Sequence, residues 1–320
     1  MNISKLLAGI AVTFLSISTF AAYPDKPLTL VVPFPPGGST DSVARAIAPK
    51  MGVTLGQNVI VDNKPGATGA IGAGFVKRAA PDGYTFMVAS IGVFAVNPFL
   101  QKNLPYDPAK DFDLLTVAVK APNVLVATPS FPANNIAEAI AYLKKNPEKV
   151  SFANSGSGSS DHLTTILFWQ KSGTSGINVP YKGGAPAITD LLGGQAELSF
   201  QNLNVVVNHV KSGKLKALAI TGDKRSPLLP GVPTLAEAGV KDVDVYSWQG
   251  VAAPKGLEPD VKKKLYNSIV GALNNPEVKK SMTDAGFEIV ANTPEQFATF
   301  LNKELARWKA VIESGKVVVD

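Results

Sequence analysis

Short apolar runs rich in β-branched residues alternate along the chain with segments whose apolar residues recur at helical spacing. Leu28–Phe34 has the pattern of a buried strand, and Ser39–Met51 follows it as a helix with one apolar face. The same patterns predict further strands at 58–61, 85–89, 114–119, 123–128, 151–154, 179–181, 197–200 and 216–221, and further helices at 70–79, 136–145, 160–171, 185–192 and 203–210. This order predicts an α/β fold in which a mainly parallel sheet is covered by helices on both sides.

The C-terminal third is largely helical after Pro254. Thr293-Pro294-Glu295-Gln296 combines an N-cap, a proline at the first helical position and a capping box. Apolar residues then recur at helical spacing as far as Ile312, which predicts an amphipathic helix whose aromatic side chains belong to the core.

The length of 320 residues suggests two domains at roughly 100–200 residues each. No repeat or low-complexity linker separates the α/β units, so we expect two lobes joined by short crossing strands near 115–125 and 240–250. The predicted organisation is a signal peptide at 1–22, a first lobe made of 23–120 and 246–320, and a second lobe at 121–245.

The first 22 residues have the layout of a secretory signal peptide. Met1–Lys5 carries one positive charge, Leu6–Phe20 is apolar, and the small residues Ala21 and Ala22 follow. The alternative is a membrane anchor, but the apolar run falls short of the roughly 20 residues that span a bilayer. We therefore expect cleavage near Ala21 or Ala22 and a periplasmic location.

Composition argues against several classes of function. The chain has no cysteine, so it has no disulfide, thiolate nucleophile or iron–sulfur cluster. It has two histidines, His162 and His209, and no carboxylate spacing that suggests a metal, so neither a metal nor a cofactor is expected. The net charge of +6 is scattered and forms no basic stripe with interleaved aromatics, so nucleic-acid binding is not expected.

The segment Pro33-Phe34-Pro35-Pro36-Gly37-Gly38-Ser39-Thr40-Asp41 leads from the first strand into the first helix. Its paired prolines and glycines shape a turn that exposes backbone N–H groups, and Ser39 or Thr40 can cap the helix. A helix N-terminus at the carboxyl end of a parallel strand is where α/β sheets bind anions. We interpret this loop as an anion site, against the alternative of an ordinary capped turn.

The segment Ser155-Gly156-Ser157-Gly158-Ser159-Ser160-Asp161-His162 has the equivalent place in the second unit. Its glycines and hydroxyl residues offer N–H and O–H donors without positive charge, which suits a carboxylate. No Gly-Lys-Ser/Thr follows, and Ser160 stands where a nucleophile elbow needs its second glycine. His162 falls in the first helical turn, where it either donates a hydrogen bond to a ligand or satisfies the loop.

Two further turns are less specific. The spacing of the glycines in Gly66–Gly74 departs from the dinucleotide fingerprint, and close packing of a helix on the sheet accounts for it better. Tyr181–Pro186 is a third strand-to-helix turn, either a ligand contact or a plain surface loop. No pair of titratable residues has a spacing that specifies acid–base catalysis, so we do not expect an enzyme.

In their order, the motifs of this chain resemble the Bug family, the periplasmic solute-binding proteins of tripartite tricarboxylate transporters. The resemblance covers essentially the whole mature chain, and its segments are highly specific only when taken together. They are PFPPGGSTDSVAR (33–45), VDNKPGATGAIG (61–72), PDGYT (81–85), NPFL (97–100), LPYDPAKDF (104–112), VPYKGGAPAITDLLGG (179–194), SGKLKALAIT (212–221), RSPLLPGVPTLAEAG (225–239) and YSWQGVAAPKG (246–256).

The resemblance implies a two-lobed periplasmic binding protein, a Venus flytrap that closes at a hinge on a small organic acid or amino acid. It implies that a ligand carboxylate is held by one loop from each lobe, and that the ligand passes to integral-membrane permease subunits. We expect a monomer. The expected ligand contacts are Phe34, Pro35, Gly37, Gly38, Ser39, Thr40, Asp41, Ser90, Ser155, Gly156, Ser157, Gly158, Ser159, His162, Tyr181 and Gln201.

Two positions depart from the family pattern. Ile166 stands where family members often carry Glu, and Gln201 stands where Asp is common. If position 201 faces the cleft, the missing carboxylate disfavours a ligand with an ammonium group, so a non-amino carboxylate, including aromatic and dicarboxylic acids, is favoured. Two alternatives stay open: an exported serine-dependent hydrolase, and a binding protein that feeds a membrane sensor.

Overall fold

The computed structural model describes residues 23–315, so the predicted signal peptide and its cleavage site lie outside the described residues. The strands are β1 Leu28–Val32, β2 Val59–Asn63, β3 Thr85–Ser90, β4 Phe112–Ala127, β5 Ser151–Asn154, β6 Ile177–Pro180, β7 Leu198–Asn202, β8 Lys216–Ile220, β9 Tyr246–Pro254 and β10 Glu288–Ile289. The helices are α1 Ser39–Leu55, α2 Ala70–Lys77, α3 Asn97–Leu100, α4 Ile136–Lys145, α5 Ser160–Ser172, α6 Gly184–Leu192, α7 Leu203–Lys211, α8 Pro259–Asn274, α9 Pro276–Asp284 and α10 Pro294–Gly315, with short turns η1 Ala67–Gly69 and η2 Gly92–Val96. Within 23–315, no helix combines the length and apolar character that crossing a bilayer requires.

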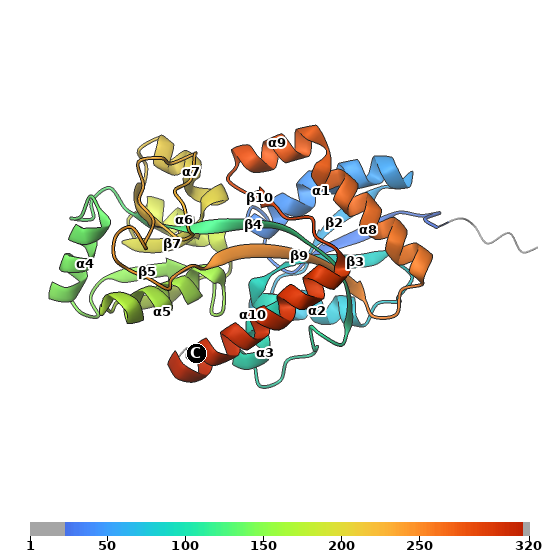
Figure 1. Ribbon diagram of the computed structural model, residues 1–320, viewed down its shortest axis with the longest axis horizontal. Coiled ribbons are helices and arrows are strands. Elements are labelled where there is room, and N and C mark those ends of the chain that lie inside the picture. The colour runs from blue at the N-terminus through green and yellow to red at the C-terminus, as the bar shows by residue number, and fades with distance from the viewer. Residues whose placement is uncertain (1–22, 316–320) are drawn as a thin grey trace, which may run out of the picture.

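The strands pair in the order β2-β1-β3-β9-β4-β7-β5-β6, with β8 and β10 also paired to β4. β1 is parallel to β2 and β3, and β5 is parallel to β6 and β7, as the alternating pattern predicts. The long strands β4 and β9 are antiparallel to their neighbours, so the sheet is mixed. Figure 1 shows two lobes, one with β1–β3 and one with β5–β7, joined by β4 and β9. The predicted lobe boundaries at 120/121 and 245/246 stay a prediction.

Strand β4 is continuous where the sequence analysis expected two strands. The expected break between 114–119 and 123–128 was wrong, because the strand runs through Pro122. Pro122 lies opposite Tyr246 of β9, and Asn123 begins the pairing with β7. Proline has no N–H to donate, but here it lies where β4 changes its partner, so its missing donor interrupts neither ladder.

Alternate residues of the central strands pack on opposite faces. Leu30 and Val32 of β1 belong to the apolar cluster under α1 and α8, whereas Val31 belongs to the cluster under α2 and α10. The strands are therefore buried on both faces, which explains why they have continuous apolar runs rather than an alternating pattern.

Two predicted helix starts are confirmed by their caps, whereas the expected capping of the first helix by Ser39 or Thr40 was wrong, since its N-cap is Gly38. The Asn135 side chain accepts a hydrogen bond from the Glu138 N–H at 2.9 Å, and Thr293 and Gln296 exchange side-chain and backbone hydrogen bonds. The close packing expected of the glycine-rich segment is also confirmed, since a Cβ at Gly72 would lie 2.7 Å from both Lys64 O and Pro33 Cβ.

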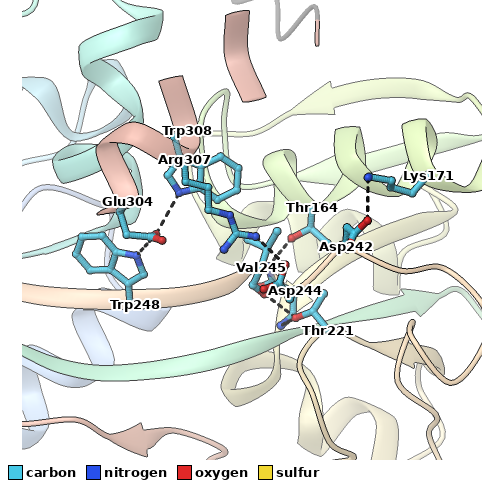
Figure 2. Close-up of polar contacts among 11 residues, drawn as sticks. Thr164, Lys171, Thr221, Asp242, Asp244, Val245, Trp248, Glu304, Arg307 and Trp308 are labelled. Atoms are coloured by element: carbon cyan, nitrogen blue, oxygen red, sulfur yellow. Dashed lines mark hydrogen bonds and ion pairs between the residues drawn. The ribbon is translucent and has the colours of Figure 1, made fainter. Parts of the chain in front are cut away.

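The segment that leads into β9 is held by ion pairs from both lobes (Figure 2). Lys171 of α5 contacts Asp242 at 3.1 Å, and Arg307 of α10 contacts Asp244 at 2.8 Å. Thr221 also donates a hydrogen bond to the Val245 carbonyl at 2.6 Å. The crossing chain is thus fixed to one helix of each lobe.

Helix α10 is attached to β9 through one carboxylate. Glu304 accepts hydrogen bonds from the indole N–H of Trp248 at 2.9 Å and of Trp308 at 3.1 Å (Figure 2). Both indoles are buried, so this carboxylate satisfies two donors that would otherwise lack a partner. As predicted, the aromatic residues of the closing helix belong to the core.

Candidate functional site

A cavity of about 70 Å³ lies between the lobes, where the loops after β1 and β5 meet. At the roughly 10–15 Å³ that one water needs, this is space for a few non-hydrogen atoms. Among the described residues, Asp161 is the one charged member of the lining. The lining residues are Phe34, Pro35, Pro36, Gly38, Ser39, Thr40, Thr68, Ser90, Gly92, Ser155, Ser159, Ser160, Asp161, Gly183, Gly184, Ala185, Gln201, Asn202, Val205, Ser247 and Gln249.

The loop after β1 is held in shape by hydrogen bonds to the Asp41 side chain. The Asp41 carboxylate accepts hydrogen bonds from the Gly37 N–H at 3.0 Å, from Arg45 Nε at 2.9 Å and from Asn63 Nδ2 at 3.0 Å. Burial alone would raise the pKa of Asp41, but these donors lower it on balance. Gly37 has a φ of +86°, which favours glycine. Asp41 therefore shapes the loop and does not line the cavity.

The N-terminus of α1 is left open to a ligand. Its N-cap is Gly38, which has no side chain to accept from the first-turn N–H groups. Ser39 and Thr40 follow at the cavity wall. Unpaired N–H groups and the helix dipole both favour a negative charge at this point.

The loop after β5 is built around Asp161 in the same way. The Asp161 carboxylate accepts hydrogen bonds from the Ser155 N–H at 2.7 Å, from the Ser155 hydroxyl at 2.6 Å and from Gln201 Nε2 at 3.2 Å. Complete burial raises the pKa of Asp161, against the opposing effect of hydrogen bonds from Ser155 and Ser159. Ser159 is the N-cap of α5, where its Oγ accepts from the His162 N–H at 3.3 Å.

His162 satisfies the loop rather than lining the cavity. Its side chain is buried, and Nδ1 accepts a hydrogen bond from the Gly158 N–H at 3.1 Å. This nitrogen is therefore occupied and is not available to take a proton from a serine. Of the two roles left open by the sequence, the structure favours the structural one.

The two lobes are in contact across the cavity, so this is a closed form. Ser39 of α1 donates a hydrogen bond to Asn204 Oδ1 of α7 at 3.0 Å. A Cβ at Gly183 would lie 3.3 Å from Pro35 Cδ. The lobes therefore meet through this hydrogen bond and through close approach at glycines, as Gly183 does to Pro35 and as Gly158 does to Leu100.

The structure gathers nine of the sixteen predicted ligand contacts around the cavity. These are Phe34, Pro35, Gly38, Ser39, Thr40, Ser90, Ser155, Ser159 and Gln201. The other seven, Gly37, Asp41, Gly156, Ser157, Gly158, His162 and Tyr181, lie outside its lining. Most of these seven belong to the two loops and form their turns, whereas the Tyr181 hydroxyl donates to Asp190 at 2.7 Å.

Several lining residues were not predicted, above all Ser247 and Gln249 of β9. Both are buried polar residues in a strand that is otherwise apolar. They alternate with Trp248 and Gly250, so they share one face of the strand. The signal available in the sequence was this pair of polar residues, two positions apart within a core strand. The residues that the structure describes contain no group of three or more acidic, histidine or cysteine side chains placed to hold a metal ion.

Comparison with known proteins places the chain in a family. The model described as "Tripartite tricarboxylate transporter family receptor" matches residues 43–316. The periplasmic binding protein BugD is similar at 38% identity and a TM-score of 0.88, over 93% of this chain and 100% of that chain. Rpa4515 of Rhodopseudomonas palustris, determined with adipate, is similar at 35% identity and a TM-score of 0.88, over 91% and 97% of the two chains. MatC from Rhodopseudomonas palustris, with bound malate, is similar at 32% identity and a TM-score of 0.86, over 91% and 100%.

These relatives are solute-binding receptors and not enzymes, which argues against the hydrolase alternative and agrees with the occupied Nδ1 of His162. The resemblance inferred from the sequence motifs is confirmed, as is the two-lobed fold that it implied. The chain belongs to the tripartite tricarboxylate transporter receptor family, the periplasmic solute-binding proteins of the Bug type.

Proposed function

We propose that the protein captures a small carboxylate in the periplasm by closure of its lobes and delivers it to the integral-membrane permease subunits of a tripartite tricarboxylate transporter. The observation that carries the proposal is the cavity itself. Two strand-to-helix loops, one from each lobe, meet there with N–H and O–H donors, and no Lys, Arg or His of the described chain lines it. The adipate and malate in the names of two similar structures support the same ligand class.

The donors are sufficient for useful affinity without a buried cation. A helix N-terminus contributes roughly 0.3–2 kcal/mol toward an anion. A hydrogen bond to a charged group adds about 1.5–3 kcal/mol. Two helix termini with two or three such bonds reach about −8 kcal/mol, which corresponds to a micromolar dissociation constant.

Calorimetric titration of the mature protein with carboxylates, amino acids and neutral sugars tests the ligand class. At least one carboxylate should bind with a dissociation constant of about 1 μM or less, and a protein that binds only sugars or cations would refute the proposal. Small-angle scattering with and without saturating ligand tests closure, since a ligand that contacts both lobes favours the closed state.

Delivery to a permease requires a test in cells. A strain that lacks this chain should lose uptake of the carboxylate, and a plasmid copy should restore it. If uptake is normal but a transcriptional response to the carboxylate is lost, the sensor alternative replaces delivery. Export, the cleavage site near Ala21 or Ala22 and the monomeric state stay predictions, which mass spectrometry and sedimentation of the periplasmic protein would check.

A further inference from the structure

Gln249 has an unsatisfied oxygen at the wall of the ligand cavity. The residue lies on β9, is fully buried, and faces Ser90 across the pairing of β9 with β3. Its Nε2 donates to the Ser247 hydroxyl at 3.1 Å and to the Ser39 hydroxyl at 3.4 Å. Its Oε1, however, has no hydrogen-bond partner among the residues that the structure describes.

A buried amide oxygen without a donor is unfavourable, because it has lost its hydrogen bonds to water and gained none in return. Such an atom in a binding cavity is best explained by a donor that arrives with the ligand. The other buried side-chain atoms that lack a partner in the described chain, Asn97 Oδ1 and Trp169 Nε1, belong to residues outside the cavity lining. Among the described lining residues, Gln249 therefore holds the buried side-chain acceptor that lacks a partner.

We propose that Gln249 Oε1 accepts a hydrogen bond from a hydroxyl group of the ligand, so that the protein selects a hydroxy carboxylate over the same acid without the hydroxyl. This inference rests on the proposed function, because it assumes that the cavity takes a carboxylate. The carboxylate is held by the donors of the two loops, and Gln249 recognises the substituent on the carbon chain.

The chemistry of the remaining acceptors favours a hydroxyl over an ammonium group. An ammonium has three hydrogens and a full charge, so it requires several acceptors or a free carboxylate. The carboxylate in the lining, Asp161, already accepts from Ser155 and Gln201. One neutral oxygen matches the single O–H of an alcohol.

Matched acids that differ in one substituent test this assignment by calorimetry. The probes are malate, succinate and aspartate, together with lactate, propionate and alanine. The wild-type protein should bind the hydroxy acid of at least one set about tenfold or more tightly than its unsubstituted partner, a difference of about 1.4 kcal/mol. A buried polar group that meets no partner accounts for discrimination of this kind.

Two variants remove or keep the acceptor. Gln249→Met keeps the length of the side chain and removes the oxygen, so the hydroxy-acid preference should fall to threefold or less. Gln249→Glu keeps an acceptor of the same shape and should weaken all acids while preserving the preference. Gln195→Met, the same substitution at an exposed position, is the control and should change nothing. Thermal melting of each variant without ligand checks the fold.

The outcomes separate this inference from the proposed function. If no carboxylate binds the wild-type protein, the proposed function fails and the inference with it. If carboxylates bind without a hydroxy-acid preference, or Gln249→Met weakens both members of a pair equally, the role of Gln249 is refuted while the proposed function stands. A preference for aspartate or alanine over the hydroxy acid would refute the hydroxyl assignment.

Discussion

Replacement of Asn204 by alanine should shift the ligand-free protein toward an open form. Asn204 lies on α7 and accepts the hydrogen bond that Ser39 of α1 donates across the cavity. It does not itself line the cavity, so the substitution leaves the ligand contacts in place. The change therefore acts on lobe closure and not on ligand recognition.

The size of the effect follows from a single neutral hydrogen bond. Such a bond contributes roughly 0.5–1.5 kcal/mol net, since each partner bonds to water when the lobes separate. A loss of about 1 kcal/mol lowers the ratio of closed to open molecules about fivefold. Because only the closed form holds both loops against the ligand, the apparent dissociation constant should rise by up to the same factor.

Small-angle scattering and calorimetry together measure this effect. The radius of gyration of ligand-free Asn204→Ala should exceed that of the wild type, and saturating ligand should bring the two values together. Asn208→Ala, an exposed substitution on the same helix, is the matched control. If both variants have the wild-type radius and affinity, the Ser39–Asn204 hydrogen bond does not stabilise the closed form and the reasoning is wrong.

Other contacts give further expectations. Asp113→Ala should lower the free energy of unfolding by about 3 kcal/mol at pH 7, because this buried carboxylate accepts from the N–H groups of Gly256 and Leu257. Burial would raise the pKa of Asp113, but these donors lower it on balance. The stability that the Asp113 carboxylate contributes is therefore present above about pH 4 and is lost as the pH falls through the lowered pKa. Urea unfolding at about pH 7 and about pH 3 should show the stabilities of the wild type and Asp113→Ala converging in acid. Ser159→Ala should weaken carboxylate binding severalfold in calorimetry, whereas Ser157→Ala should not, since only Ser159 lines the cavity. Affinity should change little between low and high salt because no described cation lines the cavity, and a tenfold loss would contradict this.

The two loops that line the cavity could be predicted from sequence because their chemistry is local. A buried strand, a turn rich in glycine and the start of a helix follow one another at 28–55 and again at 151–172, and each part has its own signal. Helix N-termini at the carboxyl ends of parallel strands then meet in space as a consequence of the fold. Local pattern and topology were enough to locate the cavity.

The role of each residue within the loops could not be predicted, because it depends on contacts made elsewhere. Asp41 faces Asn63, and His162 turns its Nδ1 back to Gly158, so neither reaches the cavity. Gln249 lies about two hundred residues from the first loop, and only the pairing of β9 with β3 brings it to the site. Sequence locates donors on a loop, and the fold decides which of them face the cavity.

The two carboxylates that support the loops explain how a cavity without a cation in its described lining can be ready for an anion. Asp41 and Asp161 each lie in the first turn of a helix, and each accepts a backbone N–H from its own loop, at Gly37 and at Ser155. They fix the loops before a ligand arrives, which lowers the entropy lost on binding. Asp41 is balanced by the Arg45 guanidinium, but the donors to Asp161 from Ser155 and Gln201 are neutral, and burial raises the pKa of Asp161. The lobe with the β5 loop therefore carries the greater electrostatic cost of closure on an anion, and a second carboxylate in place of the uncharged Gln201 would add to it.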